Sequence, residues 1–118
     1  MVLPHTVQPI LGTASFGDPK TFWGQSNDNI RQGLAVFQRY GGTTLDTAQA
    51  YQGGWALDAE TNSREGILKA AEESLKSLRV PKVDVFYLHA PVYNVPIEET
   101  LAGINDTYEA GMFKRFGL

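Results

Sequence analysis

Short apolar runs alternate with longer amphipathic stretches along the chain, and this alternation constrains the fold more than any other feature of the sequence. The clearest run, VDVFYL at residues 83–88, combines β-branched and aromatic residues as strands do. Strands that alternate with helices form βα units around a parallel sheet. We expect strands at residues 9–13, 43–47, 83–88 and 113–117, and helices at residues 28–40, 63–78 and 96–110.

The starts and the apolar faces of the expected helices can also be read from the sequence. Asn62 and Glu65 are spaced like a capping box at the start of the second helix. Pro96 suits a first-turn position in the third helix, which Gly111 ends. The stripes expected to be buried are Ile30, Leu34, Phe37 and Tyr40, then Ile67, Ala71, Leu75 and Leu78, and then Ile97, Leu101, Ile104 and Tyr108.

The spacing of the expected strands narrows the architecture without deciding it. Successive strands after the second lie about 30 to 40 residues apart, and a (β/α)8 barrel of about 250 residues uses about 31 residues for each unit. This spacing fits a barrel and a doubly wound sheet equally well. The sequence has no Gly-x-Gly-x-x-Gly pattern, which disfavours a Rossmann phosphate loop.

Charge and composition exclude several classes of function. A net charge of −3 disfavours a nucleic-acid binder, which needs a basic surface. The absence of cysteine excludes disulfides and thiolate metal sites, and we expect no metal centre. No apolar run is long enough to cross a membrane, and MVLPHTVQP lacks the apolar core of a signal peptide. We therefore expect a cytoplasmic protein with no membrane partner.

Polar residues at the carboxyl ends of the expected strands are the candidate site, because α/β folds place their active sites there. Asp46 and Tyr51 follow the second strand, and His89 ends the third. Each also has a structural interpretation, as a turn residue, a packed ring and a strand-end histidine respectively. Phe22 and Trp23, in the loop after the first strand, are expected on the same face, with a place in the core as the alternative.

Two motifs in the right order carry a specific resemblance to the aldo-keto reductases. LDTAQAY at residues 45–51 resembles the family's DTAxxY signature, and VDVFYLHAP at residues 83–91 resembles the strand that delivers its histidine. The YLHAP sequence at residues 87–91 is most similar to the branch of aflatoxin-aldehyde and succinic-semialdehyde reductases. Weaker likenesses to the first barrel strand, a later helix and the following strand occur at residues 10–13 (ILGT), 98–101 (EETL) and 111–118 (GMFKRFGL).

The resemblance implies a fold and a reaction. The fold is an incomplete (β/α)8 barrel, roughly its first half, in which residues 1–118 are part of one NADP-dependent oxidoreductase domain. The reaction is NADPH-dependent reduction of a small aldehyde or ketone, with Tyr51 as general acid. The family's aspartate, matched by Asp46, holds a lysine beside the tyrosine and borders the cofactor. His89 matches the histidine that orients the carbonyl oxygen. A phenol with a pKa of about 10 needs such a cation to donate its proton readily.

The lysine itself is missing, which is the main departure from the family. It belongs on barrel strand 3, yet only 11 residues separate Tyr51 from the helix at 63, whereas a βα unit needs about 30. Either residues 55–61 (WALDAET) are a remnant of that strand, with Glu60 at the lysine position, or the strand is deleted. A carboxylate there raises the tyrosine pKa. The lysines on the second helix and before the third strand do not substitute for it: Lys69, Lys76 and Lys82.

The sequence also stops at Leu118, after the expected fifth barrel strand. In the family, most contacts to the NADP phosphates come from later strands, so the remaining cofactor residues are absent from these 118 positions. Open strand edges favour self-association. Two hypotheses follow: an NADPH-dependent reductase, or a truncated, inactive fragment. A missed exon in the transcript would restore the lysine. A third hypothesis, an unrelated α/β binding module, requires both motifs to be coincidental.

Overall fold

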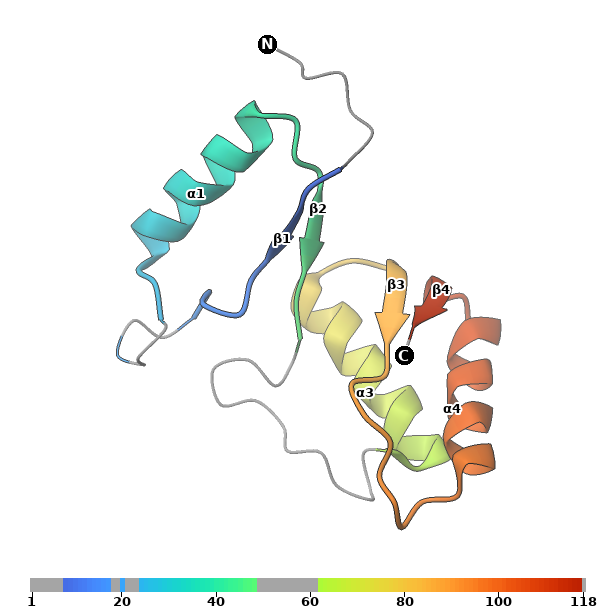
Figure 1. The fold of residues 1–118 in the computed structure, drawn as a ribbon. Helices are drawn as coiled ribbons and strands as arrows, with labels where there is room; N and C mark the ends of the chain where they lie inside the picture. The colour runs from blue at the N-terminus through green and yellow to red at the C-terminus, as the bar shows by residue number, and fades with distance from the viewer. Residues whose placement is uncertain (1–7, 18–19, 21–23, 49–61, 118) are drawn as a thin grey trace. The chain divides into compact units, whose positions relative to one another are not determined.

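The computed structural model describes residues 8–17, 20, 24–48 and 62–117. The chain divides into two compact units, Met1–Trp55 and Ala56–Leu118, and each is described by itself. The described elements follow one another as strand, helix, strand in the first unit and as helix, strand, helix, strand in the second (Figure 1). This order matches the alternation that the sequence predicts.

The first unit is built on a parallel pair of strands. β1 (Ile10–Gly12) lies beside β2 (Thr44–Asp46), with Ile10 opposite Thr44 and Gly12 opposite Asp46. α1 (Asn27–Arg39) connects them, and the Ser26 side chain caps it by accepting a hydrogen bond from the Asn29 amide. No residue of α1 is buried in the described structure, so the stripe expected on this helix is at most half-buried.

The second unit contains two pairs of elements, each a helix followed by a strand. α3 (Arg64–Leu78) leads into β3 (Val83–Tyr87), and α4 (Ile97–Glu109) leads into β4 (Phe113–Gly117). β3 and β4 are parallel, with Val83 opposite Phe113 and Tyr87 opposite Gly117. The two helices pack against each other (Figure 1). Parallel strands joined by a helix are the predicted βα arrangement.

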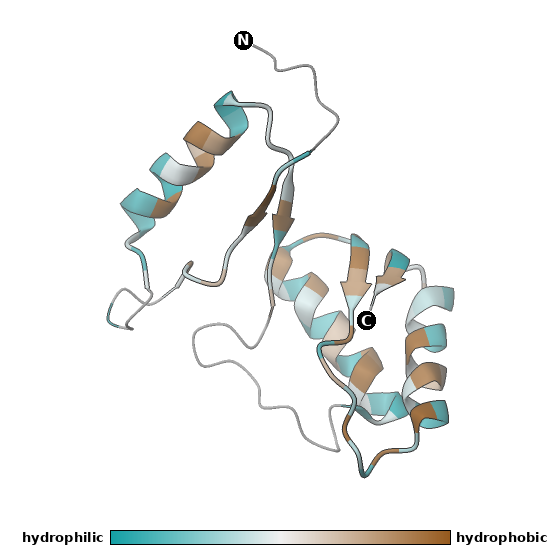
Figure 2. Cartoon of the chain, viewed as in Figure 1, coloured by the Kyte–Doolittle hydropathy of each residue, from teal (hydrophilic) through white to brown (hydrophobic). Residues whose placement is uncertain are grey.

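The core of the second unit lies between its helices and strands. Its buried members come from α3, the end of β3, α4 and β4, and the aromatic rings of Phe86 and Phe113 stack with centroids 5.5 Å apart. Figure 2 shows the corresponding hydrophobic residues along the strands and on parts of the helices. The buried residues are Ile67, Leu88, Ile104 and Phe113, with Val83, Phe86 and Phe116 packed against them.

The buried face of α4 differs from the predicted one. Only Ile104 of the expected stripe is buried, while Ile97, Leu101 and Tyr108 are 48%, 47% and 52% exposed. The face turned inward carries small residues instead, because α4 approaches α3 so closely at Gly103 that an added Cβ would lie 2.8 Å from the Arg64 carbonyl oxygen. The residues actually buried are Thr100, Gly103, Ile104 and Thr107.

The start of α3 also differs from the prediction. Ser63, not Asn62, is the N-cap, and its hydroxyl accepts a hydrogen bond from the Gly66 amide at 3.1 Å. Asn62 is instead buried one residue before the cap. The predicted stripe of α3 is correct for Ile67 and Ala71, whereas Leu78 at the other end of the helix is exposed.

The remaining sequence predictions fall into two groups. The parallel pairing of the first two strands is confirmed, as are all three helices to within a few residues. The placement of strand 83–88 next to these first two strands concerns the relation between the units and stays a prediction. Phe22, Trp23, Tyr51 and Glu60 lie outside the described residues.

Candidate active site

Asp46 is the last residue of β2, and its backbone is fixed by the neighbouring strand end. The amide and the hydroxyl of Thr13 both donate to the Asp46 carbonyl oxygen, each at 2.9 Å. Thr13 is buried, with 7% of its surface exposed, whereas the Asp46 side chain is exposed. The two hydrogen bonds therefore hold the peptide while the carboxylate stays accessible at the carboxyl end of the strand.

His89 lies two residues beyond β3, at the carboxyl end of that strand. The β3–β4 ladder continues one residue past the strand, where the Leu88 amide donates to the Gly117 carbonyl oxygen at 3.1 Å. His89 follows directly and is exposed. An imidazole in this position is available to donate a hydrogen bond to a carbonyl oxygen, which is the chemistry that the sequence motif predicts.

Asn62 secures the chain just after His89. Its side-chain amide nitrogen donates to the Ala90 carbonyl oxygen at 3.0 Å. Its backbone carbonyl oxygen accepts a hydrogen bond from the Thr100 hydroxyl at 2.9 Å. Sequence reasoning missed this residue by treating it as a helix cap. The available signal was the pair Asn62–Ser63, two residues able to cap one helix, of which only one can occupy the cap position.

The structure places two of the three predicted catalytic residues, Asp46 and His89, at strand ends. The convergence of the three side chains at one site stays a prediction. Asp46 belongs to the first unit and His89 to the second. Tyr51 lies outside the described residues. Lys69 and Lys76 lie on α3, and Lys82 directly precedes β3 at its amino end, as the sequence interpretation has it.

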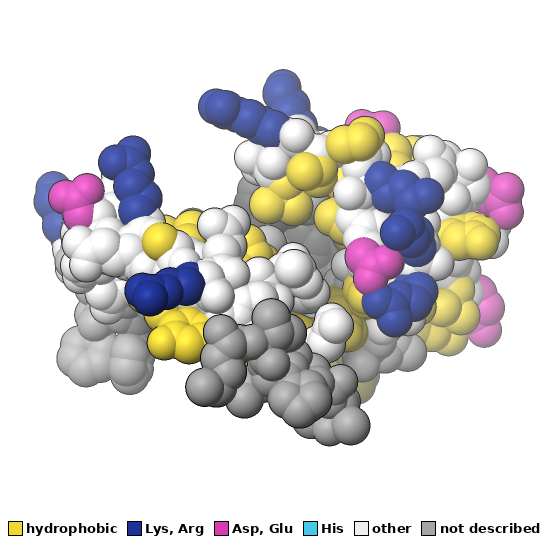
Figure 3. All heavy atoms as spheres, turned by 90° about the horizontal axis from the view of Figure 1, so that it is seen from above, with side chains coloured by type: hydrophobic (Ala, Val, Ile, Leu, Met, Phe, Trp, Pro, Cys, Tyr) yellow, Lys and Arg dark blue, Asp and Glu magenta, His cyan; other side chains and the backbone are white. Residues whose placement is uncertain are grey.

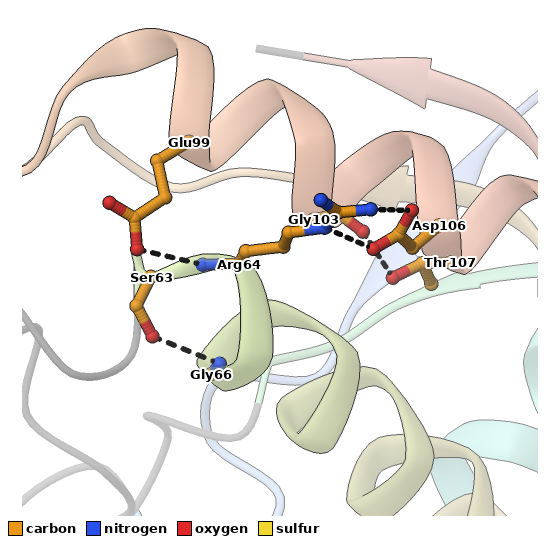
Figure 4. Close-up of polar contacts among 7 residues, drawn as sticks. All are labelled: Ser63, Arg64, Gly66, Glu99, Gly103, Asp106 and Thr107. Carbon is orange, nitrogen blue, oxygen red and sulfur yellow. Dashed lines mark hydrogen bonds and ion pairs between the residues drawn. The ribbon is translucent and has the colours of Figure 1, made fainter.

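The charged pairs of the second unit lie on its surface between elements. Arg64 on α3 forms two hydrogen bonds to the Asp106 carboxylate of α4, at 2.6 and 2.9 Å (Figure 4). The side-chain hydrogen bond from Arg64, reinforced by its charge, lowers the pKa of Asp106. In the same way, the hydrogen bond from Arg115 and the nearby Lys114 lower the pKa of Asp84. These basic groups therefore already have carboxylate partners.

Two hollows among the described residues each contain one basic side chain, Lys114 or Arg64, that is already paired with a carboxylate. One hollow, between α4 and β4, is largely apolar, and the other combines Arg64 with the carboxylates of Glu65 and Glu99. In Figure 3 some basic side chains stand next to acidic ones, and others stand apart from them. A phosphate site needs free cations or converging backbone amides. The apolar hollow is lined by Leu101, Ile104, Asn105, Tyr108, Phe113, Lys114 and Phe116.

Metal sites and membrane-spanning helices are both missing from the same ranges. Among the described residues, no group of three or more His, Cys, Asp or Glu side chains is arranged to hold a metal ion. None of the described helices has the length and apolar character needed to cross a membrane.

Comparison with known families decides which fold these βα units belong to. The model of the aldo/keto reductase family matches residues 56–118, which is more than half of the chain and includes β3, the His89 segment and β4. The chain belongs to the aldo/keto reductase family. The motif at residues 83–91 lies within the matched residues, whereas the motif at residues 45–51 lies before them. The interpretation as an unrelated binding module is excluded.

The curated relatives of this aldo/keto reductase chain are longer proteins. Oxidoreductase sirO of Leptosphaeria maculans is 35% identical over 97% of the chain and 43% of its own length. Aflatoxin B1 aldehyde reductase member 2 of Homo sapiens is 31% identical over 98% of the chain and 38% of its own length. The mouse protein of the same name is 37% identical over 80% of the chain. The chain thus spans less than half the length of these relatives.

A solved structure shares the fold of this aldo/keto reductase chain. A protein assigned as a 2,5-diketo-D-gluconic acid reductase B superposes with a TM-score of 0.68, at 23% identity, over 92% of the chain and 42% of its own chain. At that identity the likeness bears on the fold alone. The fold is an incomplete (β/α)8 barrel, and the doubly wound alternative is excluded.

The alignments also contain positions of the relatives that have no counterpart in this aldo/keto reductase chain. The sirO alignment extends over 142 positions although the chain has 118 residues, so at least 24 positions (142 − 118) have no counterpart in it. The human alignment extends over 143 positions and gives the same result. A loss of this size is close to one βα unit of about 31 residues. The location of these positions after Tyr51 stays a prediction.

Proposed function

We propose that the chain is part of an NADPH-dependent reductase of small aldehydes or ketones, with Tyr51 as general acid. The proposal rests on one observation above all: the family's aspartate-tyrosine and histidine motifs are both present, in order. Its described members, Asp46 and His89, lie at the carboxyl ends of parallel strands. Barrel enzymes carry their catalytic residues at these ends.

The proposed roles follow from what carbonyl reduction requires. A hydride adds to the carbonyl carbon, and a proton must reach the oxygen as the alkoxide forms. In this proposal the nucleotide supplies the hydride, Tyr51 donates the proton, and His89 holds the oxygen through a hydrogen bond. Asp46 serves to position a cation beside the phenol, which would lower the tyrosine pKa toward neutrality.

The proposed site lacks an identified cation for Asp46 to position beside the phenol. Of the candidate lysines, Lys69 and Lys76 lie on α3, and Lys82 stands at the opposite end of β3 from His89. Positions present in the relatives are missing here. Loss of positioned general-acid catalysis costs about 10²–10⁴-fold in rate. We therefore propose, as the second candidate, that the 118-residue polypeptide by itself is catalytically inactive.

The two candidates are separated by assaying NADPH oxidation with succinic semialdehyde as the probe aldehyde. The variants are Tyr51→Phe, which removes only the phenolic hydroxyl, and the matched control Tyr40→Phe at an exposed tyrosine after α1. For the 118-residue chain we expect background turnover in all three proteins. Turnover that Tyr51→Phe abolishes and Tyr40→Phe preserves would show that the chain is active without the lysine.

A longer form would test the reductase proposal itself. Reading the transcript between Tyr51 and Asn62 shows whether it encodes a further strand with a lysine. In a form that contains this strand, Tyr51→Phe should lower turnover by about 10²–10⁴-fold while leaving aldehyde binding intact. Unchanged turnover in that variant would remove Tyr51 from the mechanism.

A further inference from the structure

Asn62 is a buried polar residue that no part of the proposed reaction uses. Only 2% of its surface is exposed. Burying an amide side chain without hydrogen bonds costs about 1–3 kcal/mol by protein mutational data, and Asn62 avoids this cost by donating to the Ala90 carbonyl oxygen at 3.0 Å. A residue buried and engaged in this way has one conformation imposed on it by its surroundings.

The backbone of Asn62 is fixed independently of its side chain. Its carbonyl oxygen accepts a hydrogen bond from the Thr100 hydroxyl at 2.9 Å, and Thr100 is itself buried in the first turn of α4. Ser63, the next residue, caps α3. Asn62 is therefore tied to the starts of both helices before its side chain reaches across to Ala90.

The bond that Asn62 donates acts at the peptide next to His89. The ladder between β3 and β4 is last seen at Leu88, whose amide bonds to Gly117. Beyond it, His89 is exposed, and Pro91 has no amide hydrogen with which to anchor the loop. The hydrogen bond from Asn62 to Ala90 thus secures the chain on the far side of His89 from the strand.

We propose that Asn62 is a positioning residue for His89. It fixes the peptide that follows the histidine, so that the imidazole is presented from a rigid backbone at the carboxyl end of β3. The catalytic consequence rests on the proposed function, in which His89 orients the carbonyl oxygen. The positioning itself can be measured without turnover.

The test is solution NMR of the 118-residue chain, with Asn62→Asp as the main variant. The substitution keeps the shape of the side chain but turns the donor into a carboxylate facing the Ala90 carbonyl oxygen. We expect the His89 ring resonances and the Ala90 carbonyl carbon to shift, with faster amide exchange at both residues. Lowering the pH should partly restore the Ala90 carbonyl shift relative to the unsubstituted chain, because a protonated carboxyl donates again.

The matched control is Asn105→Asp, the same chemical change at an exposed asparagine of α4. It should leave the His89 and Ala90 signals in place. Unaltered His89 and Ala90 signals in a folded Asn62→Asp variant would overturn the proposal, and so would equal effects of the control.

A second measurement does not depend on a folded variant. In the unsubstituted chain, the side-chain amide protons of Asn62 should exchange with solvent far more slowly than those of Asn105. Equal exchange rates at the two side chains would overturn the proposal. Where an active longer form is found, Asn62→Asp should lower kcat more than it raises KM for NADPH, and a change confined to KM would contradict positioning of His89.

Discussion

At the scale of the residue, Gly103 shows how one missing side chain sets the packing of two helices. A Cβ added there would lie 2.8 Å from the Arg64 carbonyl oxygen and 3.0 Å from its Cα. Both are backbone atoms, which cannot turn away as a side chain could. We therefore expect Gly103→Ala to lower the free energy of unfolding by about 1–3 kcal/mol, through overpacking. Urea denaturation measures this change.

Gly33 provides the matched control for that substitution. It lies within α1, and an added Cβ has no atom within 4 Å. Because alanine favours a helix over glycine by about 1 kcal/mol, Gly33→Ala should raise the stability of its unit slightly. A Gly103→Ala variant as stable as the Gly33→Ala variant would contradict the close contact between α3 and α4.

Single residues also show what the sequence could predict about the site. The positions of Asp46 and His89 follow from motif and strand pattern together, since a residue at the end of a parallel strand or just beyond it must lie at its carboxyl end. Asn62 could not be assigned in this way. Its role depends on Ala90 and Thr100, which are distant in sequence and approach it only through the packing of α3, β3 and α4.

At the scale of the element, the Arg64–Asp106 pair links α3 to α4 in a pH-dependent manner. The hydrogen bond from Arg64 lowers the pKa of Asp106 below 3.8, its ordinary value. A lowered carboxyl pKa stabilises the folded state above that ordinary value, and the contribution is lost as the pH falls through the lowered pKa. Asp106→Asn should therefore lower the melting temperature at neutral pH and have a smaller effect at about pH 2.

The control for this prediction is Asp28→Asn in α1. Asp28 and Arg31 are 3.9 Å apart, and both side chains are largely exposed, so their pair should contribute nothing measurable. Thermal unfolding followed by circular dichroism at both pH values gives the comparison. A destabilisation by Asp106→Asn that persists unchanged in acid would mean that the ion pair is not its cause.

The helices themselves were predictable, but their buried faces were only partly so. The apolar periodicity predicted the position of α4 correctly but predicted the wrong buried face. The pattern reflects only where apolar residues lie, and it does not show where the backbone of one helix packs closely against another. Gly103 permits that approach and turns Thr100 and Thr107 inward, where the Thr107 hydroxyl donates to the Gly103 carbonyl oxygen at 2.8 Å (Figure 4). Leu101 and Tyr108 are consequently left on the open side of the helix.

At the scale of the whole molecule, the sequence predicted βα units but could not by itself choose their architecture. Strand spacing reports the size of a unit, which is similar in barrels and open sheets, and does not report closure. The family motifs supplied the choice, and the family match confirms it. The loss of a unit after Tyr51 stays a prediction from the 11 residues before the helix at 63, because a strand and helix need a minimum length of chain.

We propose, as the central claim, that these 118 residues contribute to the carbonyl side of a reductase site but bind the nucleotide too weakly to form a site of their own. Asp46 and His89 lie at strand ends, whereas two of the described basic residues, Arg64 and Arg115, are paired with carboxylates. Charge-assisted hydrogen bonds to phosphates contribute about 1.5–3 kcal/mol each, so their absence should weaken nucleotide binding severely.

Titration of NADPH fluorescence with the purified chain tests this claim most directly. Free NADPH and an unrelated acidic protein of similar size provide the reference signals. We expect no saturable change at micromolar protein concentrations. A saturable change with a micromolar dissociation constant would contradict it, because these 118 residues would then contain a nucleotide site of their own.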